Sequence, residues 1–118
     1  MHIIRLYYKG QIGPVVYGKL KDELPRIVSE AISKLDSALP IHPQNASLIP
    51  TEVGAKYLKH DIIVEIPLHR SKRRSAGADK ASSEILAAIQ AICDEKSKQK
   101  HSIAVSISIG EIHASSVK

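Results

Sequence analysis

The segment of the sequence with the clearest chemical potential is a basic run of Arg70, Lys72, Arg73 and Arg74, which precedes a predicted helix. The first backbone N–H groups of a helix and its dipole favour a negative charge, and guanidinium groups add paired hydrogen bonds to a carboxylate or phosphate. The run therefore predicts a site for a small anion. A solvated basic loop is the alternative, and recognition of nucleic acid is disfavoured because no aromatic residue interrupts the run.

Other residue types that perform chemistry show no pattern of a metal or nucleophilic site. The histidines lack metal-ligand spacing and are spread over predicted strands and loops: His2, His42, His60, His69, His101 and His113. Cys93 is the only cysteine, so it makes neither an intramolecular disulfide nor a structural zinc site. It falls at an apolar position of a predicted helix, where we expect a buried, inert thiol. The sequence predicts no bound metal.

The composition is that of a globular protein of one domain, covering residues 1–118. Hydrophobic residues make up 43% and charged residues 25%, and the net charge of +5 favours anions. Trp and Phe are absent, so the core must be aliphatic. No apolar run approaches the roughly 20 residues that span a bilayer, and the amino terminus lacks a signal-peptide pattern. We expect a cytoplasmic protein without a membrane partner.

Apolar periodicity predicts a strand and a helix in the first half of the chain. Alternation over residues 2–8 indicates a strand, and the Gly and Pro residues of 9–14 indicate a loop. Asp22 is a plausible N-cap with Pro25 in the first turn of a helix that runs to about Leu39. The apolar positions of this helix recur every three or four residues: Leu24, Ile27, Val28, Ala31, Ile32 and Leu35.

The second half repeats the pattern. Residues 46–53 are predicted to form an edge or bulged strand because of Pro50, and residues 60–69 form a clearer strand. A basic turn follows over residues 70–77, then a helix over 78–98 and a last strand over 103–110. The predicted inner side of that helix carries Ser82, Ile85, Leu86, Ile89, Ile92 and Cys93.

This order predicts an α+β fold made of two successive β-α-β units. Strands joined across a helix lie parallel, so the product is a four-stranded sheet with both helices on one face. The other face carries Glu65, Pro67, Ser106 and Ser108, a mixture of polar and apolar side chains. Such an open face favours a partner, and we expect a homo-oligomer.

Five segments carry a resemblance to a known family. They are Met-His-Ile-Ile at 1–4, Leu-Pro at 24–25, Asp-Ile-Ile-Val at 61–64, Arg-Ser at 74–75 and Ala-Val-Ser-Ile-Ser-Ile-Gly-Glu-Ile-His at 104–113. In their order and spacing the chain resembles the tautomerase superfamily, and within it the 5-carboxymethyl-2-hydroxymuconate isomerase group, over nearly its whole length.

The resemblance implies a trimer of β-α-β-β-α-β protomers whose sheets surround a central barrel. It also implies an active site at the amino end of the first strand. There an amino-terminal proline serves as general base or acid in a keto-enol proton shift, and a nearby arginine holds the substrate carboxylate. The resemblance implies that no metal or organic cofactor takes part.

The sequence departs from the family at the catalytic position. The family reads Met-Pro-His before the first strand, whereas this chain reads Met-His, so Met1 occupies the catalytic position. We expect Met1 to be retained, because the trimming enzyme does not accept a residue as large as His2 after it. The family's second-strand arginine also has no counterpart, since residues 43–48 contain none.

The leading hypothesis is a divergent homotrimeric tautomerase or isomerase whose activity is weak or lost. It would transfer a proton on a small keto or enol carboxylic acid, with the Met1 amine as base. Arg73 or Arg74 would steer the carboxylate, and His2, which adjoins the amine, would contribute to substrate binding. The amine has an ordinary pKa of about 7.7–8.0, which neighbouring cations lower.

Two alternatives remain. A non-catalytic module on the same scaffold would bind a small anion at the basic run, and the Met1 amine would then be an ordinary exposed terminus. An RNA-binding sheet of ferredoxin-like topology is the least favoured interpretation, because the central strands lack the expected aromatic residues.

Overall fold

A computed structural model describes residues 2–110 of the chain. Its strands are β1 (His2–Tyr8), β2 (Ala46–Glu52), β3 (Ile62–His69) and β4 (Ile103–Gly110), and its helices are α1 (Gly13–Ser33) and α2 (Lys72–Lys96). Short 3-10 turns cover Gly10–Ile12, Pro43–Asn45 and Ala55–Tyr57. The predicted β-α-β-β-α-β order is therefore confirmed.

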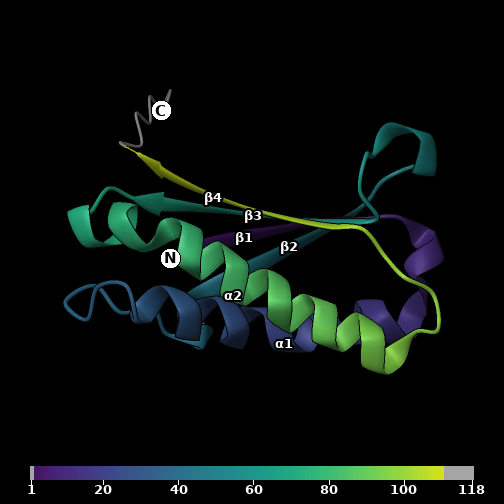
Figure 1. Ribbon diagram of the computed structural model, residues 1–118, viewed down its shortest axis with the longest axis horizontal. Helices are drawn as coiled ribbons and strands as arrows, with labels where there is room; N and C mark the ends of the chain where they lie inside the picture. Colours follow the sequence, from purple (N-terminus) through teal and green to yellow (C-terminus); the bar gives the residue numbers. More distant parts are fainter. Residues whose placement is uncertain (1, 111–118) are drawn as a thin grey trace, which may run out of the picture.

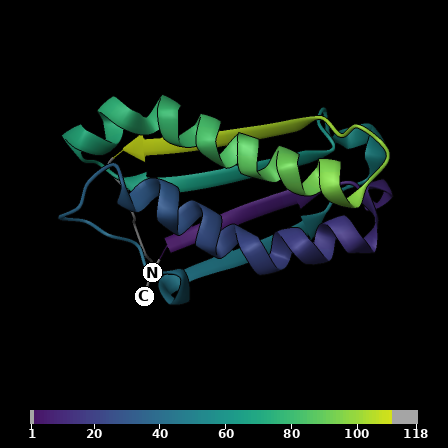
Figure 2. The same ribbon diagram turned by 60° about the horizontal axis from the view of Figure 1, so that its bottom comes forward.

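The four strands form one sheet in the order β2-β1-β3-β4. β1 pairs parallel with β2, and β3 pairs parallel with β4, as the two-unit interpretation predicts. The units join through the antiparallel pairing of β1 with β3, in which Arg5 lies opposite Glu65. Both helices cover the same face of the sheet (Figures 1 and 2).

The core lies between that face and the two helices. Its sheet side consists of Ile4, Leu6, Ile62, Val64, Ile66 and Leu68, all at most 2% exposed. From the helices, Ile32 and Ile89 are both fully buried, as predicted. Along β3 the inward residues alternate with exposed Glu65 and half-buried Pro67, so the opposite face is the mixed surface that the sequence predicts.

α1 starts ten residues before the predicted start, at Gly13 instead of after Asp22. The expected loop shrinks to a 3-10 turn, and Pro25 lies in the helix interior, not in its first turn. An interior proline costs about 3 kcal/mol. The helix continues because its buried stripe is long, and burial of each large aliphatic side chain contributes about 1.5–3 kcal/mol: Val16, Leu20, Leu24, Ile27, Val28 and Ile32.

The prediction that this helix reaches Leu39 is also wrong, because α1 ends at Ser33. The Ser33 hydroxyl accepts a hydrogen bond from the Ile41 N–H at 2.9 Å and lies 3.1 Å from the Ile41 carbonyl oxygen, to which it donates. These two bonds hold the returning chain against the last turn of α1. Ile41 is buried as a result, whereas Leu39 is exposed.

α2 also starts early, at Lys72 instead of Ala78, so most of the predicted basic turn is helical. Ser71 is its N-cap, and Gly77 lies inside the helix, where the chain that follows α1 packs closely against it. A Cβ at Gly77 would lie 2.5 Å from a methyl carbon of Leu35. The predicted inner side is correct for Ile85, Ile89, Ile92 and Cys93, but Leu86 is 37% exposed and Ala81 is buried in its place.

Within residues 2–110, neither helix combines the length and the apolar character needed to cross a membrane.

Candidate functional site

A polar cluster forms where the start of β1, the end of β3, the start of α2 and the α1–β2 connection meet at one end of the molecule (Figures 1 and 2). We call it the Arg74 cluster; it consists of His2, Asp36, Leu39, His69, Ser71 and Arg74. Its frame is the N-cap of α2, where the Ser71 hydroxyl accepts a hydrogen bond from the Arg74 N–H at 3.4 Å.

Asp36 ties this cap to the chain that leaves α1. The Ser71 hydroxyl donates a hydrogen bond of 2.7 Å to Asp36 Oδ2, and the Ala38 N–H donates one of 3.1 Å to Oδ1. The Ser71 hydrogen bond is the main cause of a lowered pKa for the Asp36 carboxyl, and it outweighs the opposing effect of burial. The charges of Arg73 and Arg74 add to the lowering. Asp36 is therefore a fixed anion at neutral pH.

Arg74 points into the protein, and only 2% of it is exposed. Nη2 donates a hydrogen bond to the Leu39 carbonyl at 2.9 Å, and Nη1 donates a longer one to the His69 carbonyl at 3.4 Å. Nε is buried and has no hydrogen-bond partner. No carboxylate among residues 2–110 forms an ion pair with this guanidinium. The Asp36 carboxylate of the same cluster interacts with the Arg74 charge without a direct ion pair, so the charge is compensated only in part and Nε remains free to donate to an added anion.

His2 lies on the helix-facing side of β1, because it alternates with Ile3 and shares its side with buried Ile4. Burial lowers the pKa of its imidazole, and the positive charge of Arg74 lowers it further. At neutral pH the imidazole is mainly uncharged and offers one donor and one acceptor nitrogen. The cluster thus places a neutral imidazole near a buried guanidinium.

The predicted site residues have different placements. Arg74 and His2 both belong to the cluster. Arg73 and Lys72 are exposed on the first turn of α2, and Arg70 is exposed just before this helix. Met1 lies outside the described residues. Sequence reasoning missed Asp36, and it missed the cap at Ser71, although a serine three residues before Arg74 is a recognisable N-cap signal.

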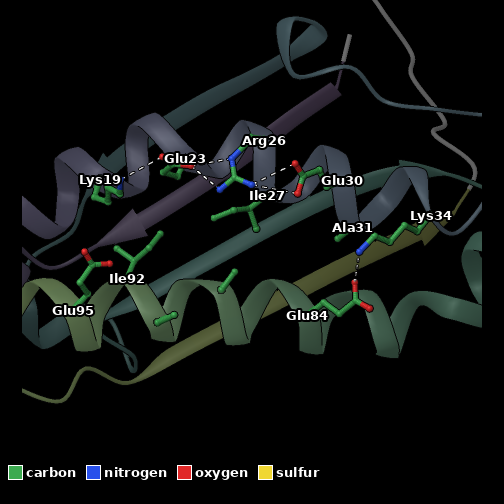
Figure 3. Close-up of a pocket in the computed structure, with 12 residues that line it drawn as sticks. Lys19, Glu23, Arg26, Ile27, Glu30, Ala31, Lys34, Glu84, Ile92 and Glu95 are labelled. Atoms are coloured by element: carbon green, nitrogen blue, oxygen red, sulfur yellow. Dashed lines mark hydrogen bonds and ion pairs between the residues drawn. The ribbon is translucent and has the colours of Figure 1, made fainter.

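Away from the Arg74 cluster, a groove of about 400 Å³ runs between α1 and α2 (Figure 3). Its charged rim is paired within the protein: Lys19 with Glu23, Arg26 with Glu23 and Glu30, and Lys34 with Glu84. The groove therefore leaves little charge for a ligand, in contrast to the Arg74 cluster. Among residues 2–110 no group of three or more His, Cys, Asp or Glu side chains is placed to hold a metal ion.

Sequence comparisons give no match for the chain, either to a protein-family model or to a curated protein. Solved structures do match. A 5-carboxymethyl-2-hydroxymuconate delta-isomerase is 13% identical with a TM-score of 0.60, over 100% of this chain and 89% of that one. Pt0534 inactivated by 2-oxo-3-pentynoate is 10% identical with a TM-score of 0.59, over 92% and 85% of the two chains.

A fused wild-type 4-OT, described as a symmetric trimer, is 14% identical with a TM-score of 0.57. That match covers 93% of this chain and 85% of the other. At these identities the likeness concerns the fold. The chain has the fold of tautomerase-superfamily proteins, which confirms the fold that the resemblance implied.

Proposed function

We propose that this chain is a divergent tautomerase- or isomerase-like protein that transfers a proton on a small keto or enol carboxylic acid. The observation that carries the proposal is the buried Arg74 guanidinium, whose Nε has no partner, at the amino end of β1. A substrate carboxylate would supply the direct ion pair that Arg74 lacks and an acceptor for Nε. We assign the reaction to this end of the sheet because the cluster is basic and adjoins the amino terminus through His2.

The chemistry requires only a base and an anchor for the carboxylate. In the ketonising direction, the Met1 amine takes the hydroxyl proton of the enol and delivers a proton to the adjacent carbon, so that C=C–OH becomes CH–C=O. Exposed Arg73 would attract the carboxylate at the rim, and Arg74 would hold it. His2 would donate a hydrogen bond to the substrate without adding charge. No metal or organic cofactor is needed for this step.

We further propose that the chain forms a homotrimer, because the matching fused 4-OT structure is described as a trimer. We also propose a cytoplasmic location, for which the sequence pattern is the only support. The helix-free face of the sheet supports assembly, since exposed Ser106 and Ser108 lie beside Glu65 and half-buried Pro67, with half-buried Ile63 on the same face. Sedimentation at micromolar concentration should therefore give a species of three chains. A single species near the monomer mass of 12.9 kDa would contradict the trimer.

The enzymatic proposal is tested with phenylenolpyruvate and a variant that has Pro inserted between Met1 and His2. The insertion should allow removal of Met1 and restore a secondary amine at the catalytic position. We expect slow turnover by the unmodified chain and faster turnover by the variant, limited by the missing second-strand arginine. Intact mass establishes which residue carries each terminal amine. If both forms run at the rate of the buffer, the catalytic proposal fails.

The second candidate is a non-catalytic module that binds a small anion. It is favoured by the way Arg74 is held, since two of its nitrogens already donate to backbone carbonyls and little of it is exposed. The absence of the family's proline favours it as well. Binding of phenylpyruvate without turnover of phenylenolpyruvate would select this candidate.

A further inference from the structure

A small hollow of about 240 Å³ lies at the other end of β1 from the Arg74 cluster. We call it the tyrosine hollow; its lining is Tyr8, Gly10, Gly13, Pro14, Tyr17 and Glu52. Six residues of extended chain separate Tyr8 from His2, or about 20 Å, so the two sites are independent. The hollow is smaller than the usual pocket for a drug-sized molecule, so it suits only a small ligand.

One wall of the hollow is aromatic. The rings of Tyr8 and Tyr17 are stacked, with centroids 4.5 Å apart and planes inclined by 26°. The Lys21 ammonium lies 5.9 Å from the centroid of the Tyr17 ring, a distance at which a cation is attracted to a ring face. The wall thus already has one cation beside it.

Glu52, at the end of β2, supplies the charge. Its carboxylate forms no ion pair with any group of residues 2–110. Gly10 leaves room beside it, since a Cβ there would lie 3.4 Å from Glu52 Oε1. Gly13 has a φ of +84°, a backbone conformation that favours glycine. Because Gly13 has no side chain, the lining of the hollow is open at this position as well.

The nearby start of α1 does not use the Glu52 carboxylate. No side chain caps this helix at Ile12. The Gly13 N–H bonds to the Gly10 carbonyl, and Pro14 has no N–H to offer. The carboxylate is therefore available to a ligand.

We propose that the tyrosine hollow binds a small organic ammonium ion. The Glu52 carboxylate would pair with its charge, and the faces or edges of Tyr8 and Tyr17 would contact its carbon atoms. An anion is excluded by the unpaired Glu52 charge. Burial raises the pKa of the Tyr8 hydroxyl, and Tyr17 and the Glu52 charge raise it further, so a bound cation should lower this pKa again.

The test uses choline chloride and its neutral isostere 3,3-dimethyl-1-butanol, followed by tyrosine fluorescence. The chain has four Tyr and no Trp, so the signal comes from tyrosine alone. We expect choline to give a saturable change with a Kd of about 1–10 mM, in the range expected for one weak charge pair and one cation–π contact. The isostere should give no saturable change. Choline should also shift the ultraviolet titration of tyrosine to lower pH.

Glu52→Gln should weaken choline binding by about fivefold, because it removes a solvent-accessible charge pair. Asp79→Asn is the control: it neutralises an exposed carboxylate on α2, outside the hollow, and should leave the Kd unchanged. Both changes are on the surface, and thermal melting verifies that each variant is folded. The proposal is overturned if choline and its isostere bind alike, if choline gives no saturable change, or if Glu52→Gln binds choline as the unmodified chain does.

Discussion

The two ends of the sheet hold buried charge in different ways. At the start of β1, Arg74 has hydrogen bonds to backbone carbonyls but no ion pair and one unpartnered nitrogen. At the other end, Asp61 accepts a hydrogen bond from the Ser102 N–H at 3.0 Å and lies 3.5 Å from Lys9 Nζ and 3.6 Å from His101 Nδ1. Arg74 lacks a direct ion pair, whereas Asp61 has both ion pairs and a hydrogen bond.

The end that holds Asp61 is best interpreted as a brace. His101 is 7% exposed; its Nε2 lies 3.2 Å from the Ser97 hydroxyl within the α2–β4 connection, and its Nδ1 joins this connection to Asp61, the residue before β3. We call this set, Lys9, Asp61, Ser97, His101 and Ser102, the Asp61 cluster. A protein gains stability from a satisfied polar network and keeps an unsatisfied one where a ligand completes it. The contrast is why we assign function to the Arg74 cluster.

Both clusters rest on one shared core, so a substitution in that core should have the largest effect on the free energy of unfolding. Ile89 is fully buried, and Ile89→Ala should lower the free energy of unfolding by about 2–5 kcal/mol. Leu86→Ala is the matched control on the same helix; with 37% of Leu86 exposed, it should cost no more than about 1 kcal/mol. Urea denaturation measures both. Equal losses would mean that the orientation of α2 is wrong.

Removing the Asp61 carboxylate, the centre of the Asp61 cluster, should have the next largest effect on the free energy of unfolding. Asp61→Ala leaves the Ser102 N–H, Lys9 and His101 without their acceptor, and should cost about 1–3 kcal/mol of unfolding free energy. Asp79→Ala is the control, since Asp79 is exposed on α2 and forms no ion pair in the described chain. If Asp61→Ala were as stable as its control, the brace would be absent.

An added anion should stabilise the protein by binding at the Arg74 cluster. Phenylpyruvate at ten times its Kd should stabilise the native protein by about 1.4 kcal/mol, or roughly 5 °C in melting temperature. Arg74→Met keeps a long apolar side chain in the site and removes the charge, so its melting temperature should not respond. An equal response of Arg74→Met would place the anion elsewhere.

Acid should weaken the Asp61 cluster over a defined range of pH. Burial acts to raise the pKa of the Asp61 carboxyl, but the Ser102 N–H, Lys9 and His101 outweigh it, and the pKa lies below its ordinary value. The stabilisation is therefore present above the unfolded pKa of about 3.9 and is lost as pH falls through the lower folded value.

Urea midpoints of the native chain and Asp61→Asn, measured between pH 7 and pH 2, test this. The midpoints should differ at neutral pH and converge as the pH falls from about 3.9, the unfolded pKa, through the lower folded pKa, where the carboxyl of the native chain becomes protonated. A difference that stayed constant over the range would show that the Asp61 charge does not contribute.

Sequence periodicity predicted the sheet, the inward strand residues and most of the inner face of α2, because one buried stripe determines them. It placed both helix starts too late, since Gly13, Pro14 and Gly77 were interpreted as loop or turn residues and Pro25 as a first-turn residue, whereas tertiary packing places all four within helices. The basic run was recognised as a possible anion site, but neighbouring Lys72, Arg73 and Arg74 point in directions about 100° apart on the helix. Only the fold determines that Arg74 turns inward and Arg73 outward.

The partners of the two clusters were beyond sequence reasoning for a similar reason. Asp36 and Ser71 are 35 residues apart, and Asp61 and Ser102 are 41 apart, and no local pattern joins such pairs. The tyrosine hollow also unites residues of β1, α1 and β2.

The central claim is that proton transfer takes place at the Arg74 cluster, and the most direct test is the rate of phenylenolpyruvate ketonisation by three folded proteins. We expect the native chain to exceed the buffer rate, and Arg26→Gln, which alters only an exposed pair of ion pairs on α1, to match it. Arg74→Met should fall to the buffer rate, since it loses the anchor for the carboxylate. Turnover by Arg74→Met at the native rate, or a native chain no faster than buffer, would contradict the account.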